Sequence, residues 1–120
     1  MTTSFSNGID PIYLDVERAL AQIGDVAALH EMLDMLQDSL DRDVPQIGHF
    51  LDALDVPSAN RLLHALKGFI PIFCVDALCD EVARVEMMSK TGTADAVGAA
   101  YRQLQPKLQQ LQSEIDAYMV

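Results

Sequence analysis

The spacing of apolar residues is the feature that most limits what this chain can fold into. Along most of the sequence, apolar residues recur every three or four positions, as they do on one face of an α-helix. The longest such run is Leu29, Leu33, Leu36, Leu40, Val44, Ile47, Leu51 and Leu54. No segment shows the sustained alternation of apolar and polar residues that a half-buried strand requires. The pattern therefore predicts an all-α protein.

Capping residues divide this pattern into a short helix and four longer ones. The first, short stripe is Ile12, Val16, Leu20 and Ile23. Gly24 interrupts it, and Asp25 can cap the next helix. Asp55 and Pro57 mark another helix start, and Gly92 marks a helix end. Short turns between the helices favour an up-down antiparallel four-helix bundle with an additional short N-terminal helix.

The helices that follow Asp55 carry three further apolar stripes. They are Leu62, Leu66, Phe69 and Phe73; Leu78, Val82 and Val85; and Val97, Tyr101, Leu104, Leu108, Leu111, Ile115 and Tyr118. Proline removes a backbone donor and crowds the preceding turn, so Pro45 predicts a kink or short break and Pro106 a bend. We expect residues 1–120 to form a single helical domain, with residues 1–10 as a flexible tail.

The charge and composition of the chain argue against several kinds of partner. With 18 acidic and 8 basic residues, the net charge is −10. Nucleic acids and anionic membranes bind basic surfaces, so neither is expected as the main partner. Two cysteines in C-x4-C spacing form neither a disulfide framework nor a zinc motif. Because the N-terminus also lacks the features of a signal peptide, a cytoplasmic protein is expected.

One segment of this acidic chain contains no acidic residue. Residues 1–55 contain eleven acidic and two basic residues, whereas no Asp or Glu occurs from Val56 to Val75. That segment carries Arg61 and Lys67. One segment of an acidic protein is therefore kept locally positive.

His64 lies in this segment, with neighbours suited to phosphoryl chemistry. At about 100° per residue, His64 lies opposite the apolar stripe, so its side chain should be exposed. Lys67, Gly68, Arg61 and Asn60 lie within about 60° of it. A phosphorylatable histidine needs exposure, nearby positive charge for its doubly charged product, and room for a partner's backbone. This face offers all three.

The string His64-Ala-Leu-Lys-Gly68 resembles the H-x-L-K-G signature of histidine-containing phosphotransfer (Hpt) domains. The resemblance extends from about residue 25 to residue 119. Asp55 stands where an acid commonly opens the histidine's helix in that family, Pro45 stands where many members have a proline, and Val85-Glu86 stands where Leu-Glu is common. The family fold is a four-helix bundle, in agreement with the helices predicted from the apolar stripes.

The resemblance implies a role for three residues. His64 accepts a phosphoryl group from the aspartyl phosphate of a receiver domain and passes it to another receiver. Lys67 matches the family's phosphate-neutralising lysine, and Gly68 matches its close-approach glycine. The expected attacking atom is Nε2 of the neutral imidazole. The protein is then a phosphoryl carrier with no cofactor or metal of its own, and the partner receiver supplies Mg²⁺.

The expected partners are response-regulator receiver domains and a hybrid sensor histidine kinase, which this chain meets as a monomer. No kinase activity is expected, because the sequence has no Gly-rich nucleotide loop. The residues expected to recognise a partner are Asn60, Arg61, Ala65, Pro71 and Val75. Two positions depart from the family pattern. Pro71 should kink the helix, and Cys74 replaces a usual glycine, and both bear on the choice of partner.

Two other classes of function are compatible with a bundle of this kind. It could dock on a receiver or kinase without phosphotransfer, as a binding module, or it could be a purely structural acidic adaptor. The cationic, glycine-containing face argues against the adaptor. His30 and His49 have no metal-ligand spacing and are expected at the boundary of the core or at the surface. Phosphorylation of His64 would separate the carrier from both alternatives.

Overall fold

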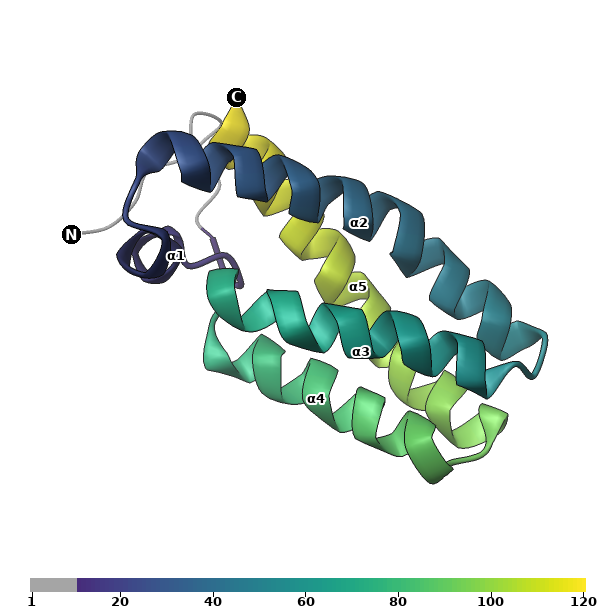
Figure 1. Ribbon diagram of the computed structural model, residues 1–120. Coiled ribbons are helices and arrows are strands. Elements are labelled where there is room, and N and C mark those ends of the chain that lie inside the picture. The colour runs from purple at the N-terminus through teal and green to yellow at the C-terminus, as the bar shows by residue number, and fades with distance from the viewer. Residues whose placement is uncertain (1–10) are drawn as a thin grey trace.

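Five α-helices make up most of the computed structural model, which describes residues 11–120 (Figure 1). They are α1 (Val16–Ile23), α2 (Val26–Asp52), α3 (Val56–Phe73), α4 (Asp76–Thr91) and α5 (Ala94–Met119). Within the described residues no strand occurs, and the β contact is an isolated bridge between Leu14 and Cys74. The prediction of an all-α protein is confirmed. The predicted tail, residues 1–10, lies outside the described residues.

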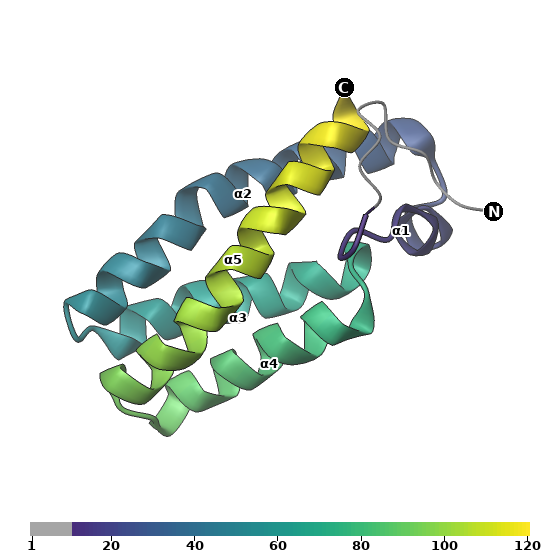
Figure 2. The same ribbon diagram turned by 180° about the vertical axis from the view of Figure 1, so that it is seen from behind.

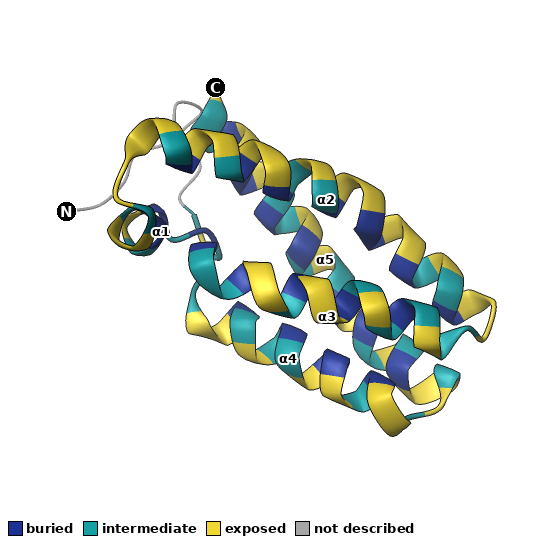
Figure 3. Ribbon diagram, in the orientation of Figure 1, coloured by how far each residue is buried: buried dark blue, intermediate teal, exposed yellow. Residues whose placement is uncertain are grey.

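The four long helices lie side by side around one core. Helix α3 packs against α2 and α4, and α5 packs against the same two helices from behind (Figures 1 and 2). Helix α1 lies at one end, against α2 and α3. The buried residues of all five helices form one contiguous cluster, and the exposed residues face outward (Figure 3). None of the helices in residues 11–120 is both long and apolar enough to cross a membrane.

Side-chain caps set the starts of α2 and α3, as the sequence predicts. The carboxylates of Asp25 and Asp55 accept hydrogen bonds from the backbone N–H three residues later, at 2.9 and 3.2 Å. Asp15 does the same for α1, so this helix begins at Val16. Ile12 therefore precedes the helix and is 61% exposed, and its predicted place on the first helical stripe is wrong.

Pro45 and Pro106 do not interrupt the helices that contain them, and Pro71 lies two residues before the end of α3. Helix α2 runs without a break through Pro45, so the short break allowed for there is absent. Helix α5 is likewise continuous through Pro106. Each proline removes one backbone donor, and both prolines are exposed, where water can satisfy the freed carbonyl. The neighbouring apolar residues remain buried and hold both helices together.

The buried face of α3 differs from the predicted one. Leu66 and Phe73 are buried as expected, but Leu62 is only half-buried and Phe69 is 48% exposed. The core residues of this helix are Ala59, Leu63, Leu66, Ile70 and Phe73. Apolar residues cover so wide an arc of α3 that two different stripes fit the helical period. Packing against α2 and α4 selects one of them, and this leaves Phe69 on the surface.

Leu54 also departs from its predicted place at the end of the long stripe. Helix α2 ends at Asp52, and Leu54 lies in the connection to α3 with its side chain 72% exposed. Its φ angle of 61° is in the left-handed region, which crowds the Cβ atom of any L-residue other than glycine. The sequence pattern could not show this, because Leu54 continues the helical spacing beyond the point where the helix stops.

This strained position leads to a stability prediction. Leu54→Gly is expected to raise the free energy of unfolding by up to about 1 kcal/mol, because glycine adopts this φ angle without strain and no buried contact is lost. Leu54→Ala removes the same exposed side chain but keeps Cβ, so it should bring no such gain. Urea unfolding of both variants checks this, and equal midpoints for the two would contradict it.

A buried carboxylate on α5 fixes the segment that precedes α1. The side chain of Glu114 is fully buried and accepts hydrogen bonds from the backbone N–H groups of Ile12, Tyr13 and Leu14, each at 2.9 Å. The same segment pairs with the α3–α4 connection, where the N–H of Val75 donates to the Tyr13 carbonyl at 2.9 Å. Helix α1 is therefore fastened to the bundle through α5 and through the end of α3.

Candidate functional site

The imidazole of His64 projects from the middle of α3, and 70% of its side chain is exposed. This confirms the predicted exposure. The reason is local: the apolar residues of α3 point into the bundle, and His64 lies on the outer side of the same turns. Neither ring nitrogen is hydrogen-bonded to another described residue within 3.5 Å, so a partner can reach the imidazole directly.

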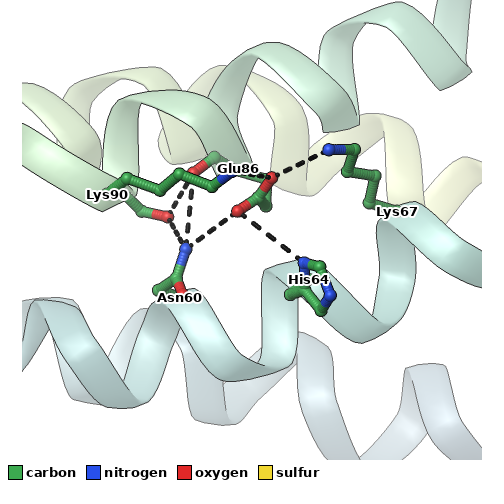
Figure 4. A network of polar contacts seen from close by, with 6 residues as sticks. Asn60, His64, Lys67, Glu86 and Lys90 are labelled. Atoms are coloured by element: carbon green, nitrogen blue, oxygen red, sulfur yellow. Dashed lines mark hydrogen bonds and ion pairs between the residues drawn. The ribbon is translucent and has the colours of Figure 1, made fainter.

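The carboxylate of Glu86, which belongs to α4, lies on the side of His64 that faces the bundle (Figure 4). The side chain of Glu86 is fully buried, and its Oε2 atom is 3.9 Å from Nδ1 of His64. Lys67 Nζ donates to Oε1 at 3.2 Å, and Lys90 Nζ lies 3.7 Å from the same oxygen. Asn60 Nδ2 donates to Oε2 at 3.0 Å. The carboxylate of Glu86 thus contacts three side chains of α3 and one of α4, which are His64, Lys67, Asn60 and Lys90.

The neighbours of Glu86 keep its carboxylate ionised. Burial alone would raise its pKa, but the hydrogen bonds from Lys67 and Asn60, together with the positive charge of Lys90, outweigh burial and hold the pKa below its usual value. Asn60 also donates to Ser89 Oγ at 2.8 Å, which fixes the amide against α4. The site therefore contains one buried negative charge and two half-exposed positive charges.

The lowered pKa of Glu86 makes part of the folding stability depend on pH. Because the folded-state pKa lies below the unfolded value of about 4.3, this contribution is complete above the unfolded pKa and is lost as the pH falls through the folded one. We expect wild type to exceed Glu86→Gln in stability most above about pH 5, with the difference shrinking at lower pH. Urea unfolding across this range checks the prediction, and a pH-independent difference would contradict it.

Gly68 lies one turn beyond His64, in a regular part of α3. A Cβ atom built at this position would meet no atom within 4 Å, and the φ angle is not positive. The fold therefore does not require glycine here, although glycine in a helix costs about 1 kcal/mol relative to alanine. The absence of a side chain leaves the backbone beside His64 open to an approaching molecule.

The other predicted recognition residues fall in different places. Ala65 is exposed next to His64, whereas Asn60 is half-buried and turned toward Glu86 and Ser89. Arg61 hydrogen-bonds Ser58 Oγ on its own helix at 3.0 Å, rather than any group of the Glu86 network.

Pro71 and Val75 lie farther along the chain, at the end of α3. Both are half-buried, and Val75 is the residue that caps α4. The structure brings Asn60, Lys67 and His64 together and leaves these two apart from them.

Glu86 and Lys90 are site residues that spacing alone did not reveal. A signal was nevertheless present: Glu86 continues the buried stripe of Leu78 and Val82 in steps of four, and an acid on a buried stripe needs a partner. Lys90 follows four residues later, at the spacing of a helical ion pair. Which residues of another helix complete the group could be learned only from the tertiary structure.

The arrangement suits a nucleophilic imidazole that gains a negatively charged group. With Nδ1 turned toward Glu86, the proton of the neutral imidazole belongs on Nδ1, which leaves the Nε2 lone pair for attack. Lys67 and Lys90 both lie against Glu86, the carboxylate that Nδ1 of His64 faces, so their positive charges are available to offset an anion on His64. Among residues 11–120, no three or more His, Cys, Asp or Glu side chains are grouped to hold a metal ion.

The comparisons with known proteins bear on the identity of this bundle. No curated protein and no solved structure matches the chain. The family model of the Hpt domain matches residues 31–117, which include α3, α4 and every member of the Glu86 network. The chain therefore belongs to the Hpt domain family, whose members have a phosphotransfer role in two-component signalling and interact with receiver domains and kinases.

Proposed function

We propose that this protein is a phosphorelay intermediate, which accepts a phosphoryl group on His64 from one receiver domain and passes it to another. The observation that supports the proposal is the exposed imidazole of His64, whose Nδ1 faces the buried carboxylate of Glu86. Lys67 and Lys90 are paired with that carboxylate. In this proposal the carrier is an up-down antiparallel four-helix bundle, a single domain that works as a monomer. It has no kinase activity of its own.

The carrier supplies few groups to the transfer reaction. Nε2 of His64 attacks the phosphorus of a receiver's aspartyl phosphate. A P–N bond forms while the P–O bond to the aspartate breaks, the electron pair leaves on the carboxylate, and the Nδ1 proton of the ring passes to solvent, so that the phosphorylated imidazole ring is uncharged. Lys67 offsets the negative charge that arrives at His64. Mg²⁺ belongs to the receiver in this scheme and stabilises the phosphoryl oxygens from that side.

An apolar surface next to the site supports the docking of a protein partner. Phe69 directly follows Gly68 and is half exposed, and Met35 on α2 is 67% exposed. A groove between α2 and α3 is lined by Met32, Met35, Leu36, Ser39, Phe69 and Phe73. Apolar surface beside an open backbone suits a receiver better than a small phosphoryl donor.

In this proposal, phosphoryl transfer takes place in the cytoplasm, and a hybrid sensor histidine kinase is a source of the phosphoryl groups. Cys74 and Cys79 are both free thiols, which suits a reducing compartment. Asn60, Arg61, Ala65, Pro71 and Val75 stay in the proposal as residues that recognise the partner.

The test is transfer from a panel of phosphorylated receiver domains, scored as acid-labile label on this protein. Wild type is expected to take up label, and His64→Gln, which keeps a neutral side chain of similar size, is expected to take up none. Label on both proteins would assign the phosphoryl group to another residue. Receiver binding without label on wild type would instead establish the non-phosphorylated binding module.

A further inference from the structure

The carboxylate of Glu86 is a negative charge next to His64, and the proposed function adds a negatively charged phosphoryl group to the same histidine. Its carboxylate is fully buried, and Oε2 lies 3.9 Å from Nδ1 of His64. A phosphoryl group on Nε2 adds about two negative charges on the other side of the same small ring. The two anions then compete for Lys67 and Lys90, the two cations that lie against Glu86.

Charge counting shows why this competition matters. Before phosphorylation, the two lysines and Glu86 together carry a net charge of about one positive unit. With about two negative charges added on His64, the group becomes net negative. If residue 86 were a glutamine, the phosphorylated site would be close to neutral. The ionised carboxylate therefore disfavours the phosphorylated state relative to an uncharged side chain of the same shape.

The ammonium groups of Lys67 and Lys90 can turn from Glu86 toward a phosphoryl group on His64. The side chains of Lys67 and Lys90 are 39% and 47% exposed, and both reach Glu86 from the rim of the site. The Lys90 contact of 3.7 Å is an ion pair without hydrogen-bond geometry, so little is lost when its ammonium group turns toward another anion. Glu86 also accepts a hydrogen bond from Asn60, at 3.0 Å, that involves neither lysine.

Resting on the proposed function, we propose that Glu86 is a positioning residue whose charge makes His64 a phosphoryl donor. It holds Lys67 and Lys90 while His64 is bare, and it opposes retention of the phosphoryl group once His64 is loaded. In the donating step, a receiver carboxylate oxygen attacks phosphorus, the P–O bond forms, and the P–N bond breaks with its electron pair returning to Nε2. The phosphorylated ring takes up a proton at Nδ1, on the side that faces Glu86, as the P–N bond breaks, so the leaving group is a neutral imidazole rather than an imidazolate.

The experiment measures the equilibrium between phosphohistidine on this protein and phosphoaspartate on a receiver that labels it. Glu86→Gln keeps an oxygen that can face Nδ1 and removes the charge. We expect it to raise the ratio of phosphohistidine to phosphoaspartate about tenfold, equivalent to about 1.4 kcal/mol. Glu86→Asp keeps the charge and should remain closer to the parent ratio than Glu86→Gln does.

Glu81→Gln is the matched control. Glu81 is also on α4 and also paired with a lysine, but its partner is Lys107 of α5. Removal of this carboxylate should leave the ratio unchanged. An equal rise in both Gln variants would show that the effect is one of net charge and would overturn the proposal, as would an unchanged or lower ratio in Glu86→Gln.

Lys90→Met provides an independent arm that does not depend on the folding of a variant at a buried position. It removes one cation from the phosphorylated site, so the ratio should fall severalfold, and an unchanged ratio would overturn the exchange of partners. Absence of label on wild type with every receiver would refute the proposed function and this inference with it. Label on wild type with no response to Glu86→Gln would refute this inference alone.

Discussion

Gly68→Gln is expected to lose most transfer from a phosphorylated receiver while the protein stays folded. A Cβ atom at this position meets no atom within 4 Å, so a glutamine side chain would extend into solvent beside His64. Glutamine is also a better helix former than glycine, by up to about 1 kcal/mol. The variant should therefore be at least as stable as wild type, and the loss should come from blocked approach of the receiver.

Gly98→Gln is the matched control for this result. Gly98 also lies inside a helix, α5, and a Cβ atom there also meets no atom within 4 Å. The two variants should share the gain in helix stability, and only the change at Gly68 should reduce transfer. A small phosphoryl donor that reacts with His64 should be much less affected than a receiver. Transfer to Gly68→Gln at the parent rate would show that the open backbone is not a docking feature.

Glu114→Ala is expected to cause a large loss of stability. It leaves the backbone N–H groups of Ile12, Tyr13 and Leu14 without their acceptor. A buried donor without a partner costs about 1–3 kcal/mol, and water can reach the exposed Ile12 more easily than Leu14. We expect a loss of about 3 kcal/mol or more in the free energy of unfolding.

Gln110→Ala separates this effect from the loss of a single hydrogen bond. Gln110 donates to Glu114 Oε2 at 3.0 Å, but the carboxylate keeps its three backbone donors when that bond is removed. The expected loss is then below about 1 kcal/mol. Urea unfolding gives both values, and hydrogen exchange at Tyr13 and Leu14 should accelerate in Glu114→Ala. A free energy of unfolding within about 0.5 kcal/mol of wild type would contradict the role assigned to this carboxylate.

The sequence determined the helices and the outward direction of His64. Asp25 and Asp55 cap helices where predicted, and Gly24 and Gly92 end them, because caps and stops act through bonds within a few residues. The stripe from Val97 to Ile115 is buried as expected. His64 could be placed because it lies far from both candidate apolar stripes of α3.

The tertiary structure decided which of those stripes became the core. The helical period shows that one side of α3 is apolar, but its apolar arc is wider than the face that its neighbours cover. Contacts with α2 and α4 buried Leu63 and Ile70 and left Phe69 exposed next to Gly68. The apolar surface beside the site is the result of that choice.

The tertiary structure also decided the partners of the buried acids. Glu86 meets Lys67 from 19 positions away, and Glu114 meets Leu14 across 100 positions. An acid on a buried stripe indicates that some partner exists, because an unpaired buried charge is costly. Local spacing cannot name that partner, since it depends on which helices become neighbours and in what register. The sequence thus determined His64 and its helix, and the packing of α4 against α3 determined the charge beneath it.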